Sequence, residues 1–232
     1  TAVLLAVWVA AGLLLRGLGL AEGSLVATAL RLVTQPLWFV GIYLGVAALA
    51  PPMLAAHRRW GLGVVAALVV GAVGVDVLRF AGGVDAVGPV NFALVWLAVH
   101  QLGFCLQSGL LTRSRAAAMV VGGLASLVVL VTAGPYPVSM VGLPGQAVSN
   151  MSPPTVALLA QGVAITGAAV LLRDAASRLL ARPRVWAAVL VAGSAAMTAF
   201  LWHLTALFLA VLGMRLLGWE PPPVGSGAWW AT

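Results

Sequence analysis

The stretch from residue 185 to residue 214 constrains the fold of this chain more than any other feature. It holds thirty consecutive residues without a formal charge, VWAAVLVAGSAAMTAFLWHLTALFLAVLGM, and a single histidine, His203. About 20 apolar residues are enough for a helix to cross the hydrocarbon core of a bilayer. Four arginines form a basic flank just before it: Arg173, Arg178, Arg182 and Arg184. The stretch therefore predicts a membrane-spanning helix that begins at a basic end.

The composition extends this prediction to the whole chain. Hydrophobic residues occupy 62% and charged residues 7% of the 232 positions, whereas soluble domains carry roughly 25% charged residues. A soluble core of this length is therefore excluded, and the bilayer acts as the solvent. The net charge of +7 comes from twelve arginines without a lysine. Because these arginines lie between apolar stretches, they indicate membrane orientation and not a nucleic-acid partner.

The apolar stretches predict about seven membrane spans in an all-α, polytopic helical bundle, with residues 1–232 forming one integral-membrane domain. Pro51 and Pro52 are expected to kink or break the second span at its far end. Residues 21–35 are expected to form a loop with a short amphipathic helix. The seven spans cover residues 1–20, 36–56, 60–80, 90–106, 116–133, 155–172 and 185–214.

The uneven distribution of arginines predicts the orientation. The loops after the second, fourth and sixth spans hold eight arginines, whereas those after the first, third and fifth hold Arg31 and Arg79. Arginine-rich loops remain on the cytoplasmic side, so the first set is expected there. The uncharged, proline-rich loop of residues 134–154 and the tail of residues 215–232 then lie outside.

Polar residues within the spans are the main candidates for chemistry. The sequence contains no phosphate-binding loop, no CxxC or HExxH spacing and no GxSxG elbow, and no metal site is expected. His203 either bonds another helix or acts as a general base or substrate contact, because imidazole titrates near neutral pH. His100 and Gln101, deep in the fourth span, and Asn91 at its start face either other helices or a wet cavity.

Two charged groups flank the third span. Asp76 and Arg79 are three residues apart in one predicted helix and can pair, which lowers the cost of two charges near the membrane. Their role is then either structural or functional. His57, Arg58 and Arg59, in the loop before this span, either mark topology alone or form a patch that binds an anionic cofactor, since guanidinium groups suit phosphates.

The loop of residues 134–154 is expected to be ordered, because its prolines reduce its freedom. Tyr136, Ser149 and Asn150 supply neutral hydrogen-bonding groups of the kind that suit sugars. The same composition is also typical of a turn-rich loop without a ligand.

Several segments, taken in order, resemble the integral-membrane acyltransferase 3 family. Each motif is short, so the resemblance depends on their order along most of the chain. The segments are residues 35–44 (QPLWFVGIYL), 51–59 (PPMLAAHRR), 91–103 (NFALVWLAVHQLG), 134–142 (GPYPVSMVG), 149–155 (SNMSPPT) and 197–205 (MTAFLWHLT).

The resemblance implies transfer of an acyl group, usually acetyl, from acetyl-CoA or another acyl-CoA to a hydroxyl of a glycan or lipid-linked acceptor beyond a bacterial plasma membrane. It implies no metal. His203 and His100 would be supporting catalytic residues, His57, Arg58 and Arg59 would face the acyl-CoA, and the 134–154 loop would face the acceptor. The family's histidine in the first helix has no counterpart here, so the chain is expected to be the C-terminal part of a longer protein, which leaves the activity of this part alone open.

Two other interpretations remain open at this point. A transporter without covalent chemistry would show inverted repeats with broken helices that meet at mid-membrane. A non-catalytic membrane scaffold would need neither histidine.

Overall fold

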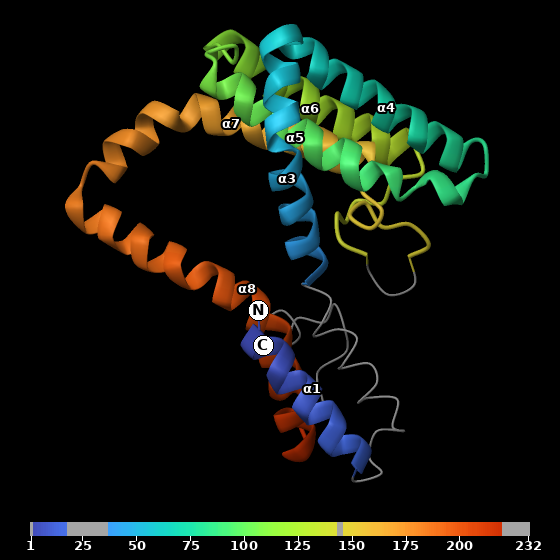
Figure 1. Ribbon diagram of the computed structural model, residues 1–232, viewed down its shortest axis with the longest axis vertical. Coiled ribbons are helices and arrows are strands. Elements are labelled where there is room, and N and C mark those ends of the chain that lie inside the picture. Colours follow the sequence, from blue (N-terminus) through green and yellow to red (C-terminus); the bar gives the residue numbers. More distant parts are fainter. Residues whose placement is uncertain (1, 18–36, 143–145, 220–232) are drawn as a thin grey trace. The chain divides into compact units, whose positions relative to one another are not determined.

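The computed structural model describes residues 2–17, 37–142 and 146–219 (Figure 1). Apart from one isolated bridge between Met151 and Pro154, these residues form helices and irregular connections. The all-α prediction is therefore confirmed. The helices are α1 (Ala2–Gly17), α3 (Leu37–Trp60), α4 (Leu62–Phe80), the 3-10 turn η1 (Asp85–Val87), α5 (Val90–Gln107), α6 (Arg113–Ala133), α7 (Val156–Leu180) and α8 (Pro183–Leu216).

Six of these helices, α3 to α8, are long and apolar enough to cross a membrane. The first predicted span corresponds to α1, which is described over 16 residues. At 1.5 Å per residue, that length is about 24 Å, against a hydrocarbon core of about 30 Å. Residues 18–20 of this predicted span, and the predicted loop of residues 21–35, lie outside the described residues. The helices make this chain a multi-pass membrane protein.

The second predicted span continues further than expected. Of the two expected effects of Pro51 and Pro52, a kink or a break, the break does not occur, because α3 runs as one helix through both prolines to Trp60. A proline removes one backbone donor, but its fixed φ is compatible with a helix. The helix ends instead where Gly61 adopts a φ of 53°, a conformation that glycine tolerates without steric cost.

This longer helix also changes the position of the basic cluster before α4. His57, Arg58 and Arg59 lie in the last turn of α3 and not in a loop. Basic side chains at this position interact favourably with the negative end of the helix dipole.

The chain divides into two compact units, which are described separately. Unit 1 contains residues 1–41 and 183–232, and unit 2 contains residues 42–182. In unit 1, α1 packs on α8. The contact buries Leu4 against Leu201, and the indole nitrogen of Trp8 donates a hydrogen bond of 3.1 Å to Thr205 Oγ1.

Unit 2 is built around α4, α5, α6 and α7. The contacting pairs are α6 with α7, α4 with α5, and α5 and α4 with α7, and the core consists of Ala72, Val95, Ala98 and Leu159. α6 and α7 approach closely because Gly123 has no side chain: a Cβ there would lie 2.8 Å from the Ala160 carbonyl oxygen. Small residues allow this close packing in membranes.

Successive helices of unit 2 reverse direction, so their termini gather at two ends (Figure 1). We call one the arginine-rich end; it contains the C-termini of α3, α5 and α7 and the connection of residues 108–112. We call the other the Asp76 end; it contains the C-terminus of α4, the N-termini of α5 and α7, and the described part of the loop of residues 134–155.

Candidate functional site

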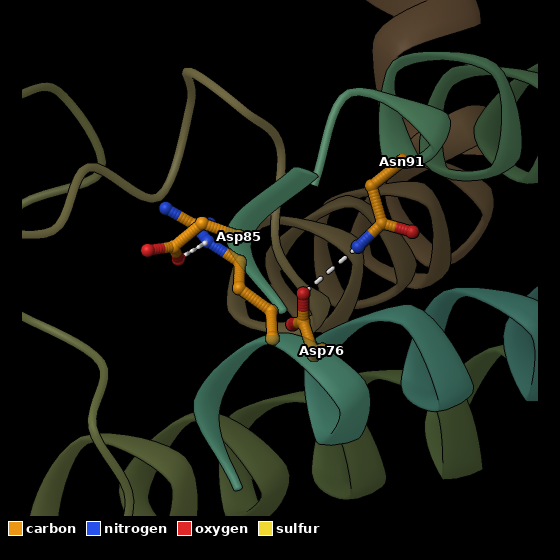
Figure 2. Close-up of polar contacts among 4 residues, drawn as sticks. Asp76, Asp85 and Asn91 are labelled. Carbon is orange, nitrogen blue, oxygen red and sulfur yellow. Dashed lines mark hydrogen bonds and ion pairs between the residues drawn. The ribbon is translucent and has the colours of Figure 1, made fainter. Parts of the chain in front are cut away.

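The Asp76 end is organised around one buried carboxylate. Asp76 lies in the last part of α4 with 2% of its surface exposed. Its Oδ1 accepts a hydrogen bond of 2.8 Å from Asn91 Nδ2 on α5 (Figure 2). Its Oδ2 accepts bonds from the Tyr136 hydroxyl at 3.0 Å and from the Val156 backbone amide at 2.8 Å. One side chain therefore connects α4, α5, α7 and the intervening loop.

Each of these partners compensates part of the cost of burying Asp76. A buried charge is tolerated when hydrogen bonds replace the water that it has lost. Val156 is the first residue of α7, so its amide lacks a partner within the helix and lies at the positive end of the helix dipole. Asp76 consequently caps α7 from a neighbouring helix.

Arg79 does not form the ion pair with Asp76 that the sequence spacing allows. Its Nε lies 3.6 Å from Asp85 Oδ1 in η1 (Figure 2), and its guanidinium lies 4.8 Å from the ring centre of Phe80. The reason is direction: the Asp76 carboxylate turns towards α5 and α7, where neutral groups donate to it. The spacing along α4 allows an ion pair between Asp76 and Arg79, but in the folded protein each side chain contacts other residues.

Asn150 fixes the fold of the loop at the same end. Its buried Nδ2 donates to the carbonyl oxygens of Pro137 at 2.7 Å and Ser139 at 3.1 Å. Its Oδ1 accepts a bond of 2.8 Å from Thr155 Oγ1. The described part of the loop is thus held by specific contacts, in agreement with the expectation of an ordered loop.

Tyr136 and Ser149 are also engaged within the protein. Burial raises the pKa of the Tyr136 phenol, and the negative charge of Asp76 raises it further, so the hydroxyl keeps its proton and stays a donor. The Ser149 hydroxyl accepts from the backbone amides of Met151 and Ser152, each at 3.2 Å. These side chains shape the surface that a ligand would meet.

The middle of α5 carries buried polar atoms of a different kind. Gln101 is fully buried, and neither atom of its amide has a hydrogen-bond partner in the described part of the chain. His100 Nδ1 and Asn91 Oδ1 are likewise unpartnered there. The His100 ring packs edge-on against Phe104, with ring centres 4.7 Å apart. An unsatisfied polar group in hydrocarbon costs several kcal/mol, so a group that bonded to these atoms would recover that cost.

The arginine-rich end places a hydroxyl beside a histidine. His57 is buried, and its Nε2 lies 3.0 Å from the Ser108 Oγ. Arg58 and Arg59 on the same turn are exposed. Sequence reasoning missed Ser108, because the two residues are 51 positions apart and no local motif joins them.

His203 belongs to unit 1 and His100 to unit 2. His203 is exposed on α8, and its Nδ1 contacts the Phe200 carbonyl oxygen of the same helix. Within the described residues no hydrogen bond joins it to another helix. The two histidines that the sequence nominated together are therefore held by separate parts of the protein.

The side chains that could bind a ligand differ between the arginine-rich end and the Asp76 end. Among the described residues, no three His, Cys, Asp or Glu side chains lie close enough to hold a metal ion. Cys105, the sole cysteine of the sequence, is buried in α5. Guanidinium groups suited to phosphates lie at the arginine-rich end, and neutral hydrogen-bonding groups lie at the Asp76 end.

Helices of membrane-spanning length, with polar groups at both ends and in the middle of α5, define a polytopic helical membrane protein with a buried polar site. A family model for an acyltransferase domain matches residues 2–232. The chain belongs to this family, acyltransferase 3, as the order of its motifs indicated, and the family implies an acyl donor. No curated protein and no solved structure matches the chain.

Proposed function

We propose that the protein transfers an acyl group from acyl-CoA to a hydroxyl group of a glycan or lipid-linked acceptor. Acetyl is the acyl group that we propose. In this proposal the arginine-rich end faces the cytoplasm and receives the donor. The Asp76 end faces the opposite side of a bacterial plasma membrane and receives the acceptor. Family membership supports the reaction class, and the positive-inside rule supports the orientation.

The observation that carries the proposal is the unpartnered polar group in the middle of α5. Gln101 offers both a donor and an acceptor, and His100 offers a ring nitrogen, between the two ends of unit 2. A purely structural bundle gains nothing from leaving such atoms unsatisfied. In an acyltransferase, an amide can hold the acyl carbonyl, and an imidazole can accept the proton of the attacking hydroxyl.

The two ends suit the two substrates. Arg58 and Arg59 are exposed, and neither forms an ion pair with the residues that the structure describes. Their guanidinium groups match the phosphates of a coenzyme A donor. At the other end, Tyr136, Ser149 and Asn150 shape the loop that would meet the acceptor, with Asp76, Asn91 and Arg79 behind it as supporting residues. His203 is proposed as a second supporting residue, in unit 1.

The test is transfer of labelled acetyl from acetyl-CoA to membrane lipids and glycans by membranes that contain the protein. Gln101→Leu removes the unpartnered amide and is expected to reduce transfer by about 100- to 1000-fold, as loss of a transition-state hydrogen bond does. Gln107→Leu makes the same change at an exposed position of α5 and is expected to leave transfer unchanged. His100→Ala is expected to reduce it by about 100-fold or more.

If the Gln101→Leu and Gln107→Leu proteins transferred acetyl equally well, this site assignment would be wrong. If no membrane sample transferred acetyl, the result would count against the proposed function.

One observation argues against the transporter interpretation. Its hallmark is a helix broken at mid-membrane, whereas α3 continues through both of its prolines. A non-catalytic scaffold would show no acyl transfer with any acceptor.

A further inference from the structure

His57 and Ser108 place a base and a hydroxyl in contact, and the proposed function assigns no role to this pair. His57 comes from the last turn of α3, and Ser108 follows the last residue of α5. The packing of the ends of these two helices brings His57 Nε2 to 3.0 Å from Ser108 Oγ. This distance is within the range over which a general base takes a proton from a hydroxyl.

The surroundings give the two residues different properties. His57 is 7% exposed, and its ring packs against Phe104, with ring centres 5.9 Å apart. Ser108 is exposed. The base is thus fixed and shielded from water, whereas the hydroxyl faces outwards, where a substrate can reach it.

The hydroxyl hydrogen of Ser108 has three acceptors within reach. The oxygen lies 2.8 Å from the Phe104 carbonyl oxygen, 3.3 Å from the Cys105 carbonyl oxygen and 3.0 Å from His57 Nε2. When the hydrogen points to a carbonyl, the imidazole donates to Oγ; when it points to an unprotonated Nε2, the imidazole accepts. The second arrangement activates the oxygen. A serine that only capped Phe104 would not need a buried histidine whose Nδ1 has no partner among the described residues.

The charge around the pair indicates the class of substrate. Arg58 and Arg59 adjoin His57 in sequence, are exposed, and carry no carboxylate partner in the described ranges. The Arg59 guanidinium lies 5.1 Å from the centre of the Trp60 ring. A nucleophilic hydroxyl at the same end of unit 2 as these exposed guanidinium groups fits a reactive acyl compound that also carries phosphates. An acyl thioester of coenzyme A has both features.

We propose that Ser108 accepts the acyl group from acyl-CoA and forms a covalent ester, with His57 as its general base; this proposal rests on the proposed function. Ser108 Oγ attacks the thioester carbonyl carbon, an oxygen–carbon bond forms and the carbon–sulfur bond breaks. His57 Nε2 takes the hydroxyl proton and passes it to the departing sulfur. The products are acyl-Ser108 and the free thiol of coenzyme A, and no oxidant or reductant is needed.

The experiment uses the purified full chain in detergent with labelled acetyl-CoA and no acceptor, followed by peptide mass spectrometry. We expect one acetyl group on the peptide that contains Ser108. Ser108→Ala abolishes the label, and His57→Ala slows labelling by about 100-fold or more. Ser114→Ala changes an exposed hydroxyl at the same end and labels like the wild type.

Ser108→Cys tests whether a loss of label reflects chemistry or misfolding. Cysteine keeps the nucleophile, so this variant is expected to take the label as a thioester that neutral hydroxylamine removes. A wild-type protein that transfers acetyl to an acceptor while Ser108 stays unlabelled and Ser108→Ala stays active overturns the covalent step and leaves the proposed function intact. Absence of both label and transfer overturns the two together.

Discussion

At the scale of single residues, one buried side chain carries most of the order at the Asp76 end. Asp76 accepts hydrogen bonds from three segments that are 15, 60 and 80 positions away in sequence. Hydrogen bonds to a charged group contribute about 1.5–3 kcal/mol each, roughly twice the neutral value. Loss of one donor therefore has a measurable cost without removing the others.

Tyr136→Phe removes one of these donors and keeps the ring that packs on Phe80. We expect it to lower the free energy of unfolding by about 1.5–3 kcal/mol, measured by thermal denaturation in detergent. Tyr43→Phe is the control, because Tyr43 is 63% exposed on α3 and the same change should have little effect there. Equal stability of the two variants would contradict the role of the Tyr136 hydroxyl.

The pKa of Tyr136 gives this contribution a defined pH range. Burial, together with the charge of Asp76, raises the pKa of this phenol in the folded protein above the unfolded value of about 10. The unfolded chain therefore ionises first. The stability difference between the wild type and Tyr136→Phe is expected to be constant from neutral pH to about pH 10 and to decrease above it. A difference that grows with alkaline pH would show that the phenol ionises more readily in the folded state.

At the scale of elements, glycines decide how closely α6 and α7 pack. A Cβ at Gly123 would lie 2.8 Å from the Ala164 Cβ, and one at Gly167 would lie 2.6 Å from the Ala116 carbonyl oxygen. Both distances are below van der Waals contact, so the two helices could hold their present separation only with glycine there. In a bilayer, where apolar surface gives helices no reason to associate, such packing supplies much of the attraction.

Gly123→Ala is expected to push α6 from α7 and to lower the free energy of unfolding by about 1–3 kcal/mol, as overpacking does. Gly122→Ala is the matched control, because a Cβ there meets nothing within 4 Å and alanine favours the helix. Thermal denaturation of both variants in detergent measures the difference. A Gly123→Ala protein as stable as Gly122→Ala would mean that the helix pair relaxes freely.

At the scale of the whole molecule, the acyltransferase family match covers both units, and six helices can cross a membrane. Alternation of these helices separates the arginine-rich end of unit 2 from the Asp76 end. In the proposed function, this separation gives the donor and the acceptor distinct places, and the arginine-rich end is the cytoplasmic one.

Cysteine labelling tests that orientation. In a Cys105→Ala background, Val138→Cys lies at the Asp76 end, where Val138 is 80% exposed, and Ser114→Cys lies at the arginine-rich end. A membrane-impermeant maleimide is expected to label the cysteine at position 138 in intact cells and the cysteine at position 114 only after permeabilisation. The opposite pattern would invert the topology and, with it, the assignment of donor and acceptor sides.

Much of this protein follows from local sequence. Uninterrupted apolar stretches determined the helices and the membrane as their solvent, because backbone groups in hydrocarbon must bond within the helix. The order of short motifs indicated the family. The effect of Pro51 and Pro52 could not be predicted in the same way, since a helix boundary depends on whether neighbouring turns compensate a lost donor.

The site, in contrast, was decided by tertiary structure. The sequence nominated His57, Asp76, Asn91, Gln101 and Tyr136 one by one, but side-chain partners depend on how helices pack. Spacing along one helix suggested Arg79 for Asp76, whereas packing supplied donors from α5, α7 and the loop. No sequence pattern pointed to Ser108, because its contact with His57 depends on the packing of the ends of α3 and α5. The sequence alone thus determines which segments span the membrane. Only the tertiary structure determines which polar side chains contact one another, because contacts between distant residues leave no periodic pattern in the sequence.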